Sequence, residues 1–295
     1  MLGIRRLIGN WFINHPRFWI DRLSVYNVYR ALTGHFRVLP DFIILGGAKC
    51  GTTSMFEYLI EHPDIYSPSN KEINFFNRYF PRGINWYRGN FALSAYKFYI
   101  EKICRRSFLT GEATPNYLIH PLTAKRISEF IPNVKLIVLL RNPVERAYSH
   151  YIMEKQLGNE KLSFDEAIKC EENRLSGENE KMIENENYYS YKCQWYSYLA
   201  SGRYVEQLKL LFKYFSKEQI LILNTKELDE NPSKIYQKTL KFFTLSPFEL
   251  KFKKHNVGKY SEMPSIIRKN LVEYFHPHNE YLFQFLGSKF NWNIN

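Results

Sequence analysis

One segment of the sequence, residues 41–63, restricts the fold more than any other. Phe42-Ile43-Ile44-Leu45 is a short apolar run, and two glycines follow it directly. An amphipathic stretch from Thr52 to Glu61 comes next and is ended by His62-Pro63. A short buried strand, a glycine turn and a helix in this order are typical of the opening unit of a parallel α/β sheet.

The same alternation continues along the chain. Apolar runs at 108–111, 135–140 and 219–223 predict further strands, and helical periodicity is found at 122–130, 143–156, 164–176, 204–215 and 232–243. Strands that alternate with helices form parallel sheets covered on both faces. We therefore predict an α/β fold with a P-loop-type parallel β-sheet flanked by helices on both faces. We also expect His276-Pro277-His278 to form a turn near a terminal helix.

Length and composition predict the domain organisation. A chain of 295 residues that is 45% hydrophobic suits one large domain. We assign this domain to residues 41–295, after an N-terminal basic aromatic extension of residues 1–40. The extension holds six arginines and one acidic residue, and several Trp and Phe residues lie among them. Two interpretations stay open: a helix packed on the domain, or a basic amphipathic segment in peripheral contact with a membrane or a polymer.

Charge and composition also limit the partners and the compartment. The formal charge of +12 favours anionic partners. Four scattered cysteines without a CxxC pair indicate neither a disulfide framework nor a zinc site, so we expect a reducing, cytoplasmic location. We expect no transmembrane segment and no secretory signal, because the apolar runs are short and Arg5 and Arg6 lie where a signal would be apolar. We expect no nucleic-acid partner, because no RRM, KH or zinc-finger pattern accompanies the aromatic residues.

The glycine turn has the features of an anion site. In its sequence, GGAKCGTT, Gly46 and Gly51 have the spacing of the Walker pattern GxxxxGK[ST], and Thr53 stands at the Ser/Thr position. Thr52 replaces the usual lysine, which has moved inside the loop to Lys49. Glycines permit a tight turn, backbone N–H groups point inward, and the helix N-terminus adds partial positive charge. We therefore predict that this loop binds a phosphate-like anion.

A second anion site is predicted after the strand at 135–140. A nucleotide triphosphatase needs an Asp there to hold Mg²⁺, but Arg141 follows the strand. Arg141 and Ser149 would lie at the carboxyl edge of the sheet, where ligands bind. These two residues favour a ligand with two separate anionic ends, although an ion pair between Arg141 and an acid of the fold is equally compatible with the sequence.

The helix that follows Arg141 has clear start signals. Asn142 is a good N-cap, Pro143 suits the first helical position, and Glu145 completes a predicted capping box. We interpret Arg146 as structural.

Together the two segments resemble the sulfotransferases that use 3′-phosphoadenosine 5′-phosphosulfate (PAPS). GGAKCGTTSMFEYLIEHP is similar to their 5′-phosphosulfate loop, and KLIVLLRNPVERAYSHY is similar to their 3′-phosphate motif. Three further segments, KEINFF from Lys71, GEATPNYL from Gly111 and NVGKY from Asn256, indicate the branch of the heparan sulfate N- and O-sulfotransferases and their bacterial relatives. The resemblance runs from about residue 41 to about residue 264.

The resemblance implies roles for particular residues. It implies that Lys49 contacts the phosphosulfate and acts in catalysis by stabilising charge on the leaving phosphate. It also implies that Arg141 and Ser149 hold the 3′-phosphate and that Glu72 is the catalytic general base. The residues that it implies for PAPS binding are Lys49, Cys50, Gly51, Thr52, Thr53, Ser54, Arg141, Ser149, Lys259 and Tyr260. No metal is implied, and the product would be adenosine 3′,5′-bisphosphate. The residues alone favour a different interpretation of Glu72, a surface carboxylate paired with Lys71; the resemblance favours the general base.

The implied reaction transfers the sulfuryl group from PAPS to a hydroxyl or an amine by in-line displacement, in which positioning and electrostatics supply most of the catalysis. The implied acceptor is a carbohydrate, a glycolipid or a secondary metabolite. Glycosaminoglycan specificity does not carry over, because Ala113 stands where heparan-type enzymes have a lysine. Trp86-Tyr87 and residues 188–198 could line an acceptor cleft or pack in the core.

Two other functions remain open at this point. One is an ATP-dependent P-loop kinase or NTPase, which the missing Asp argues against. The other is a non-catalytic protein that binds an anionic polymer.

Overall fold

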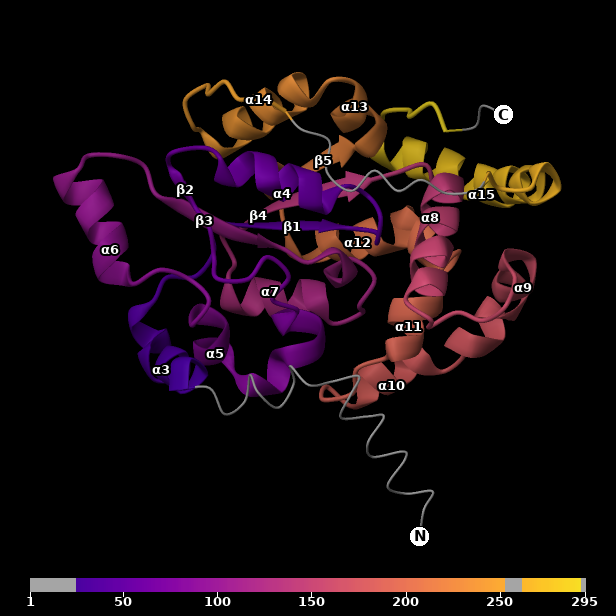
Figure 1. Ribbon diagram of the computed structural model, residues 1–295, viewed down its shortest axis with the longest axis horizontal. Coiled ribbons are helices and arrows are strands. Elements are labelled where there is room, and N and C mark those ends of the chain that lie inside the picture. The colour runs from indigo at the N-terminus through magenta and orange to yellow at the C-terminus, as the bar shows by residue number, and fades with distance from the viewer. Residues whose placement is uncertain (1–24, 253–261, 293–295) are drawn as a thin grey trace, which may run out of the picture.

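The computed structural model describes residues 25–252 and 262–292 (Figure 1). Its sheet has five parallel strands in the order β2-β3-β1-β4-β5. The strands are β1 (Phe42–Gly46), β2 (Ile65–Tyr66), β3 (Leu109–Ala113), β4 (Lys135–Leu140) and β5 (Ile220–Asn224). The predicted parallel α/β fold is confirmed, and the four predicted strands lie within two residues of the observed ones.

The strand order creates a crevice at one edge of the sheet. β1 lies between β3 and β4, with Ile43 beside Glu112 on one side and beside Leu136 on the other. After β1 the chain builds β2 and β3 on one side, and after β3 it crosses over to build β4 and β5 on the other. The order therefore reverses between β1 and β4, and in open parallel sheets ligands bind beyond the carboxyl ends of the strands at such a point.

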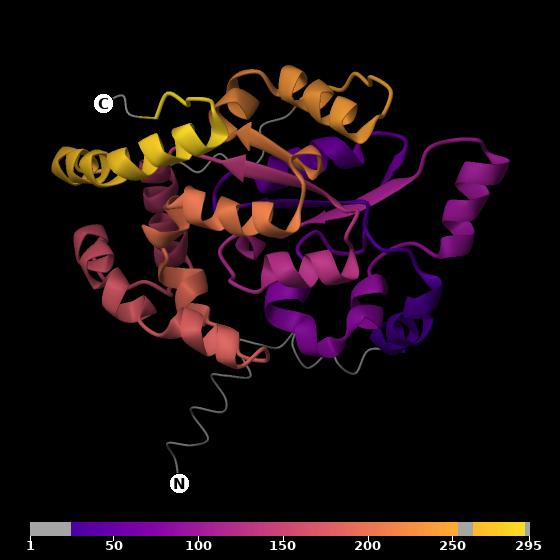
Figure 2. The ribbon, with the colours of Figure 1, turned by 180° about the vertical axis from the view of Figure 1, so that it is seen from behind.

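Helices cover both faces of this sheet (Figures 1 and 2). Alternate residues of β1 and β4 point to opposite faces, as strand geometry requires. One set packs against α7 (Thr123–Phe130) and α12 (Tyr204–Tyr214), and the other packs against α4 (Thr52–Ile60) and α14 (Pro232–Phe243). All of β1 is buried, which explains why its sequence is a continuous apolar run instead of an alternating one.

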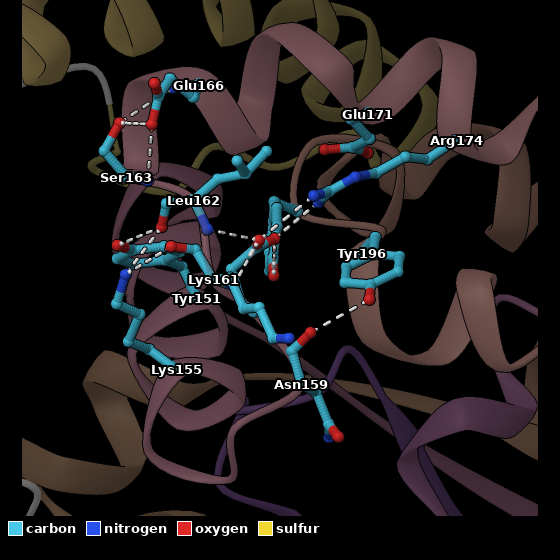
Figure 3. Close-up of polar contacts among 12 residues, drawn as sticks. Tyr151, Lys155, Asn159, Lys161, Leu162, Ser163, Glu166, Glu171, Arg174 and Tyr196 are labelled. Atoms are coloured by element: carbon cyan, nitrogen blue, oxygen red, sulfur yellow. Dashed lines mark hydrogen bonds and ion pairs between the residues drawn. The ribbon is translucent and has the colours of Figure 1, made fainter. Parts of the chain in front are cut away.

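A third apolar cluster joins the helices that extend beyond the sheet. It includes residues of α8 (Pro143–Gln156), α9 (Phe164–Leu175) and α15 (Ser265–Leu286). Polar contacts fix the connection between α8 and α9 (Figure 3): Lys155 donates to the carbonyls of Lys161 and Leu162, at 3.1 and 2.9 Å. In the same view, a capping box between Ser163 and Glu166 starts α9.

The remaining elements are short. They are α3 (Val25–Thr33), α5 (Ile84–Arg88), α6 (Ser94–Phe98), α10 (Glu178–Glu184), α11 (Tyr191–Tyr196), α13 (Thr225–Glu230), the π-helical turns η2 (Phe75–Tyr79) and η4 (Tyr99–Ile103), and the 3₁₀ turns η1 (Gly34–Phe36), η3 (Phe80–Arg82), η5 (Pro115–Tyr117), η6 (Ala200–Gly202) and η7 (Lys217–Gln219). α3 and η1, from the predicted extension, contact α5, and residues 1–24 lie outside the described part of the chain.

Two local predictions differ from the structure. Asn142 caps α8 through the amide of Val144 at 3.0 Å, as predicted, but Glu145 forms an ion pair with Arg268 at 2.5 Å in place of the predicted capping box. The predicted turn at residues 276–278 is wrong, because these residues lie inside α15. Over the ranges 25–252 and 262–292, no helix combines the length and the apolar character needed to cross a membrane.

Candidate active site

The loop between β1 and α4 forms a concave backbone surface. Lys49 and Gly51 both have positive φ, at 72° and 86°, and the Cys50 amide donates to the Gly47 carbonyl at 3.1 Å. Alternating backbone handedness of this kind turns successive N–H groups toward one point, which suits an anion. The first amides of α4 have no acceptor within their own helix, and the helix dipole adds partial positive charge there.

Close packing beneath the loop explains its first two glycines. A Cβ on Gly46 would lie 2.7 Å from the Leu139 carbonyl oxygen, and a Cβ on Gly47 would lie 2.8 Å from Cδ of Arg146. Arg146 is fully buried and donates to the carbonyls of Ser197 and Tyr198. The interpretation of Arg146 as structural is therefore confirmed. Its buried side chain packs directly against the backbone of the loop at Gly47.

The two predicted anion motifs, far apart in the sequence, are in contact in the structure. Nη1 of Arg141, directly after β4, donates to the Lys49 carbonyl at 3.2 Å. Tyr204, from the first turn of α12, donates to the Arg141 carbonyl at 2.8 Å and lies 3.7 Å from Sγ of Cys50. Thr225, directly after β5, donates to the carbonyls of Cys50 and Leu140, at 2.7 and 3.0 Å. Hydrogen bonds thus join the loops that follow β1, β4 and β5 at the crevice.

The other predicted nucleotide residues fall into three groups. Thr53 and Ser54 are partly exposed at the start of α4, whereas Thr52 and Ser149 are buried. The Cys50 side chain is completely buried, and burial raises the pKa of its thiol. Cys50 therefore shapes the loop through its backbone and its packing. Lys259 and Tyr260 lie outside the described residues.

Glu72 lies beside the first turn of α4. Nζ of Lys71 is 2.5 Å from Oγ1 of Thr53 and 3.1 Å from Oε1 of Glu72. The side chain of Lys71 is 22% exposed and that of Glu72 is 46% exposed. The ion pair that the sequence left open is therefore formed, and the same ammonium group links the Glu72 carboxylate to the loop.

A buried carboxyl holds the segment that follows Glu72. Oε2 of Glu112, on β3, accepts from the amide of Ile73 at 3.3 Å and from Oγ1 of Thr114 at 2.6 Å. Oε1 of Glu112 accepts from the hydroxyls of Tyr87 and Tyr117, at 2.8 and 3.0 Å. Burial raises the pKa of Glu112 to about 7, and the four hydrogen bonds oppose that rise.

Two hydrogen-bond partners of Glu112, Thr114 and Tyr117, also bind the backbone of the two residues after Ile73. The Asn74 amide donates to Oγ1 of Thr114 at 3.3 Å, and the Phe75 amide donates to the Tyr117 hydroxyl at 2.8 Å. Asn74 has a φ of 53°, so the backbone turns sharply at this point. One buried polar cluster therefore binds the three successive amides of residues 73 to 75. These hydrogen bonds fix the backbone next to Glu72 and so the position of its side chain.

Sequence reasoning missed most of this support. Tyr204, Thr225, Glu112, Tyr117 and Lys71 were not predicted to act at the site. One signal was available: Glu112 is a charged residue inside a run that otherwise has the character of a buried strand, and a buried charge needs partners. The identity of those partners depends on contacts between distant parts of the chain.

Aromatic and arginine side chains flank the Glu72 segment. The guanidinium group of Arg78 lies 5.0 to 5.7 Å from the ring centres of Tyr79, Tyr189 and Tyr191, and Nη2 of Arg78 donates to the Tyr191 hydroxyl at 2.9 Å. The guanidinium group of Arg82 lies 4.8 Å from the ring centre of Trp86. Of the aromatic residues predicted for a cleft or the core, Tyr87 and Tyr198 are fully buried, whereas Trp86, Tyr189, Tyr191 and Trp195 keep some exposure.

The family described as "Sulfotransferase domain" matches residues 39–275, a span that includes the loop, Glu72 and Arg141. The chain belongs to the sulfotransferase domain family. It is accordingly an enzyme, a sulfotransferase. A crystal structure titled as a sulfotransferase from Alicyclobacillus acidocaldarius is 30% identical, covers 87% of this chain and all of its own, and superposes with a TM-score of 0.67.

Two curated relatives extend the comparison. "Membrane-associated sulfotransferase kil1" of Dictyostelium discoideum is 29% identical over 88% of this chain and 68% of its own length. The human "Bifunctional heparan sulfate N-deacetylase/N-sulfotransferase 3" is 30% identical over 71% of this chain but only 23% of its own length. The chain therefore matches less than a quarter of that bifunctional relative. Over the described residues, no group of three or more His, Cys, Asp or Glu side chains is arranged to hold a metal ion.

Proposed function

We propose that this sulfotransferase uses PAPS as donor and transfers its sulfuryl group to a hydroxyl or an amine of a carbohydrate-containing acceptor. The observation that carries the proposal is the contact between Arg141 and the Lys49 carbonyl, at 3.2 Å. It joins two cationic, backbone-rich sites at the β1–β4 crevice, as a nucleotide with anionic groups at two positions requires. The ATP-dependent kinase or NTPase and the non-catalytic polymer binder are set aside, because the chain belongs to a sulfotransferase family.

The side chains and amides at the crevice suit the two anionic ends of PAPS. In the proposal, Lys49, Gly51, Thr52, Thr53 and Ser54 surround the phosphosulfate end, and Cys50 keeps the loop in shape. Arg141 and Ser149 hold the 3′-phosphate, and Lys259 and Tyr260 act with them as the family resemblance implies. PAPS supplies an activated sulfuryl group on a phosphate that is a good leaving group, so the protein has mainly to orient the reactants and to stabilise charge.

Glu72 is the general base of the proposal. Its partly exposed carboxylate can accept the proton of an incoming hydroxyl or amine, and a positioned base contributes about 10²–10⁴-fold to such reactions. The Lys71 ammonium, 3.1 Å from Glu72 and 2.5 Å from Thr53, lies between the base and the start of α4. We infer that this ammonium group stabilises negative charge on the group in transfer.

The acceptor class is inferred from the side chains beside Glu72. Arg78, Arg82, Tyr79, Trp86 and Tyr191 form a surface of aromatic rings and guanidinium groups. Sugar rings pack against aromatic faces, and guanidinium groups bind carboxylate or sulfate substituents. A saccharide or a glycolipid with anionic groups is therefore the acceptor that this surface suits best. A Tyr191→Ala variant should raise the KM for such an acceptor and leave donor binding unchanged.

The donor is tested by thermal unfolding with adenosine 3′,5′-bisphosphate, ATP·Mg²⁺ or AMP added separately. A ligand at 100 times its Kd stabilises by about 2.7 kcal/mol, enough to raise the unfolding midpoint by several degrees. We expect a shift with the bisphosphate that is lost in Lys49→Ala and in Arg141→Ala. A shift with ATP·Mg²⁺ alone would contradict the proposal.

The base is tested by turnover with PAPS and a panel of acceptors. Glu72→Gln should bind the bisphosphate as the wild type does and lose at least about 10²-fold in kcat. Wild-type turnover in this variant would remove Glu72 from the proposal without affecting the donor.

The cellular location is part of the proposal as well. We infer a cytoplasmic enzyme with peripheral membrane contact through residues 1–40. One relative is named as membrane-associated, and the composition of residues 1–40 supports such contact.

A further inference from the structure

Two segments at one end of the molecule expose most of the large apolar side chains that the described residues leave to solvent. They are residues 28–36 of α3 and η1, and residues 93–103 around α6 and η4 (Figures 1 and 2). Nine of the seventeen exposed large apolar side chains of the described residues belong to them: Val28, Tyr29, Leu32, Phe36, Leu93, Tyr96, Phe98, Tyr99 and Ile103. We call these two segments the apolar end.

The two segments are joined by their backbones. Arg37 and Leu93 form an antiparallel bridge, and the Val38 amide donates to the Ala92 carbonyl at 3.0 Å. The side chain of Arg37 adds a hydrogen bond to the Phe91 carbonyl at 2.7 Å. The residues just before α6 therefore lie beside the residues just after η1.

One side of the α6–η4 helix holds it to the protein. Ile100 is buried, the ring of Tyr96 lies 5.8 Å from that of Tyr66, and Lys97 forms an ion pair with Asp41 at 3.1 Å. The side chains of Phe98 and Ile103 instead remain 60% and 65% exposed. The helix is thus fixed in place, and it presents apolar side chains to solvent away from its attachment.

The apolar end carries exposed positive charge. With the residues directly next to it, over residues 28–37 and 93–107, it contains six Lys and Arg residues and one acidic residue, Glu101. Of the six cations, Arg30 is buried, and Lys97 and Arg106 form ion pairs with Asp41 and Asp64. Lys102 and Arg105 are exposed and form no ion pair with any described residue. Apolar and aromatic side chains among unpaired cations are the combination that binds the interface of an anionic bilayer, where the apolar groups enter the acyl boundary and the cations meet lipid phosphates.

We propose that the apolar end is a docking surface for anionic membranes and that the α6–η4 helix inserts Phe98 and Ile103 into the bilayer interface. The proposal does not depend on the sulfuryl donor or on Glu72. The sequence of residues 1–24, which leads into α3, has the same composition, with Arg5, Arg6, Arg17 and Arg22 among aromatic residues.

The test is co-sedimentation of the full chain with phosphatidylcholine vesicles, with and without phosphatidylglycerol. We expect the wild type to bind the anionic vesicles and to bind the neutral ones weakly. The double variant Phe98→Ser/Ile103→Ser should lose about tenfold or more in vesicle affinity. Lys102→Glu should lose about fivefold, and this loss should shrink at high salt.

A matched control separates this surface from general hydrophobicity. Leu157 and Ile266, each 65% exposed, lie in other parts of the molecule. The double variant Leu157→Ser/Ile266→Ser should bind vesicles as the wild type does, and the unfolding midpoints of both double variants should show that they are folded.

Three results would overturn the proposal. The first is the absence of wild-type binding to anionic vesicles. The second is equal binding by the two double variants, which would assign the contact to another part of the chain. The third is self-association of the wild type without vesicles that Phe98→Ser/Ile103→Ser abolishes, which would assign the surface to a second copy of the chain.

Discussion

The buried carboxyl of Glu112 makes the stability of this enzyme depend on pH near neutrality. Four hydrogen-bond donors surround Glu112, and no ion pair joins it to a described cation. Its burial raises the pKa from 4.5 to about 7 in the folded state. The folded protein therefore holds a proton at this site that the unfolded chain has already released at pH 5 to 7.

The sign and size of the effect follow from this difference. A raised pKa in the folded state contributes stability that is complete below pH 4.5 and is lost as the pH rises through 7. At about 1.4 kcal/mol for each unit, and with a pKa that changes from 4.5 to about 7, the contribution should fall by about 2–3 kcal/mol between pH 5 and pH 8.

The perturbation is Glu112→Gln. It keeps the shape of the side chain and replaces the titrating carboxyl by an amide, whose charge does not change with pH. We would measure the free energy of unfolding in urea at several pH values between 5 and 8, for the wild type and for the variant. The wild-type value minus the variant value should fall by about 2–3 kcal/mol across this range. A difference that stays constant with pH would refute the reasoning.

A second buried carboxyl offers a comparison. Burial also raises the pKa of Glu171 to about 7, with the amides of Leu199 and Ala200 as its donors. Glu171→Gln should produce a similar dependence on pH. It should affect turnover less than Glu112→Gln does, because Glu171 accepts from the amides of Leu199 and Ala200, whereas Glu112 accepts from the Ile73 amide next to Glu72. Glu112→Gln should lower kcat as well, because its NH2 group cannot accept a hydrogen bond where one of the Glu112 oxygens accepts from the segment after Glu72 or from a tyrosine.

Three further substitutions test the geometry of the site. Gly47→Ala pushes a methyl group against Arg146; it should cost about 1–3 kcal/mol in urea unfolding and weaken bisphosphate binding in a thermal-shift titration. Tyr117→Phe removes the hydroxyl between Glu112 and the Phe75 amide; it should cost about 1–3 kcal/mol of stability and lower kcat with little change in bisphosphate affinity. Lys71→Met removes the cation between Glu72 and Thr53; it should lower kcat by about 10²-fold in a PAPS turnover assay, and unchanged kcat would exclude Lys71 from catalysis.

The sheet could be predicted from the sequence because its signal is local. A strand buried on both faces needs an uninterrupted apolar run, and Leu136 to Leu140 supply one. The loop and Arg141 could be placed for the same reason, since each follows such a run directly. The two-residue strand β2 and the helix α6 have no comparable local pattern.

The support of the site could not be predicted, because it consists of contacts between distant residues. Thr225 reaches Cys50 across 175 positions, and Tyr204 reaches it across 154. Glu112 in the sequence could be a surface residue of a strand end. Only the pairing of β3 with β1 and β2 buries it beneath the Glu72 segment. The helix that contains Pro277 was missed for a related reason: its packing overrides the local preference for a turn.

The hydrogen bonds of Thr225 have a consequence for the synthesis of the chain. The loop at residues 47–51 leaves the ribosome early, but the hydroxyl that fastens it to β4 is supplied only when residue 225 has emerged. Domains fold from the N-terminus as they are made, yet this loop must wait for the last strand of the sheet. A nascent chain that ends before β5 would carry the 47–51 loop, Glu72 and Arg141 and still lack the contacts that give this loop its finished shape, so we expect premature termination to yield no partly active enzyme.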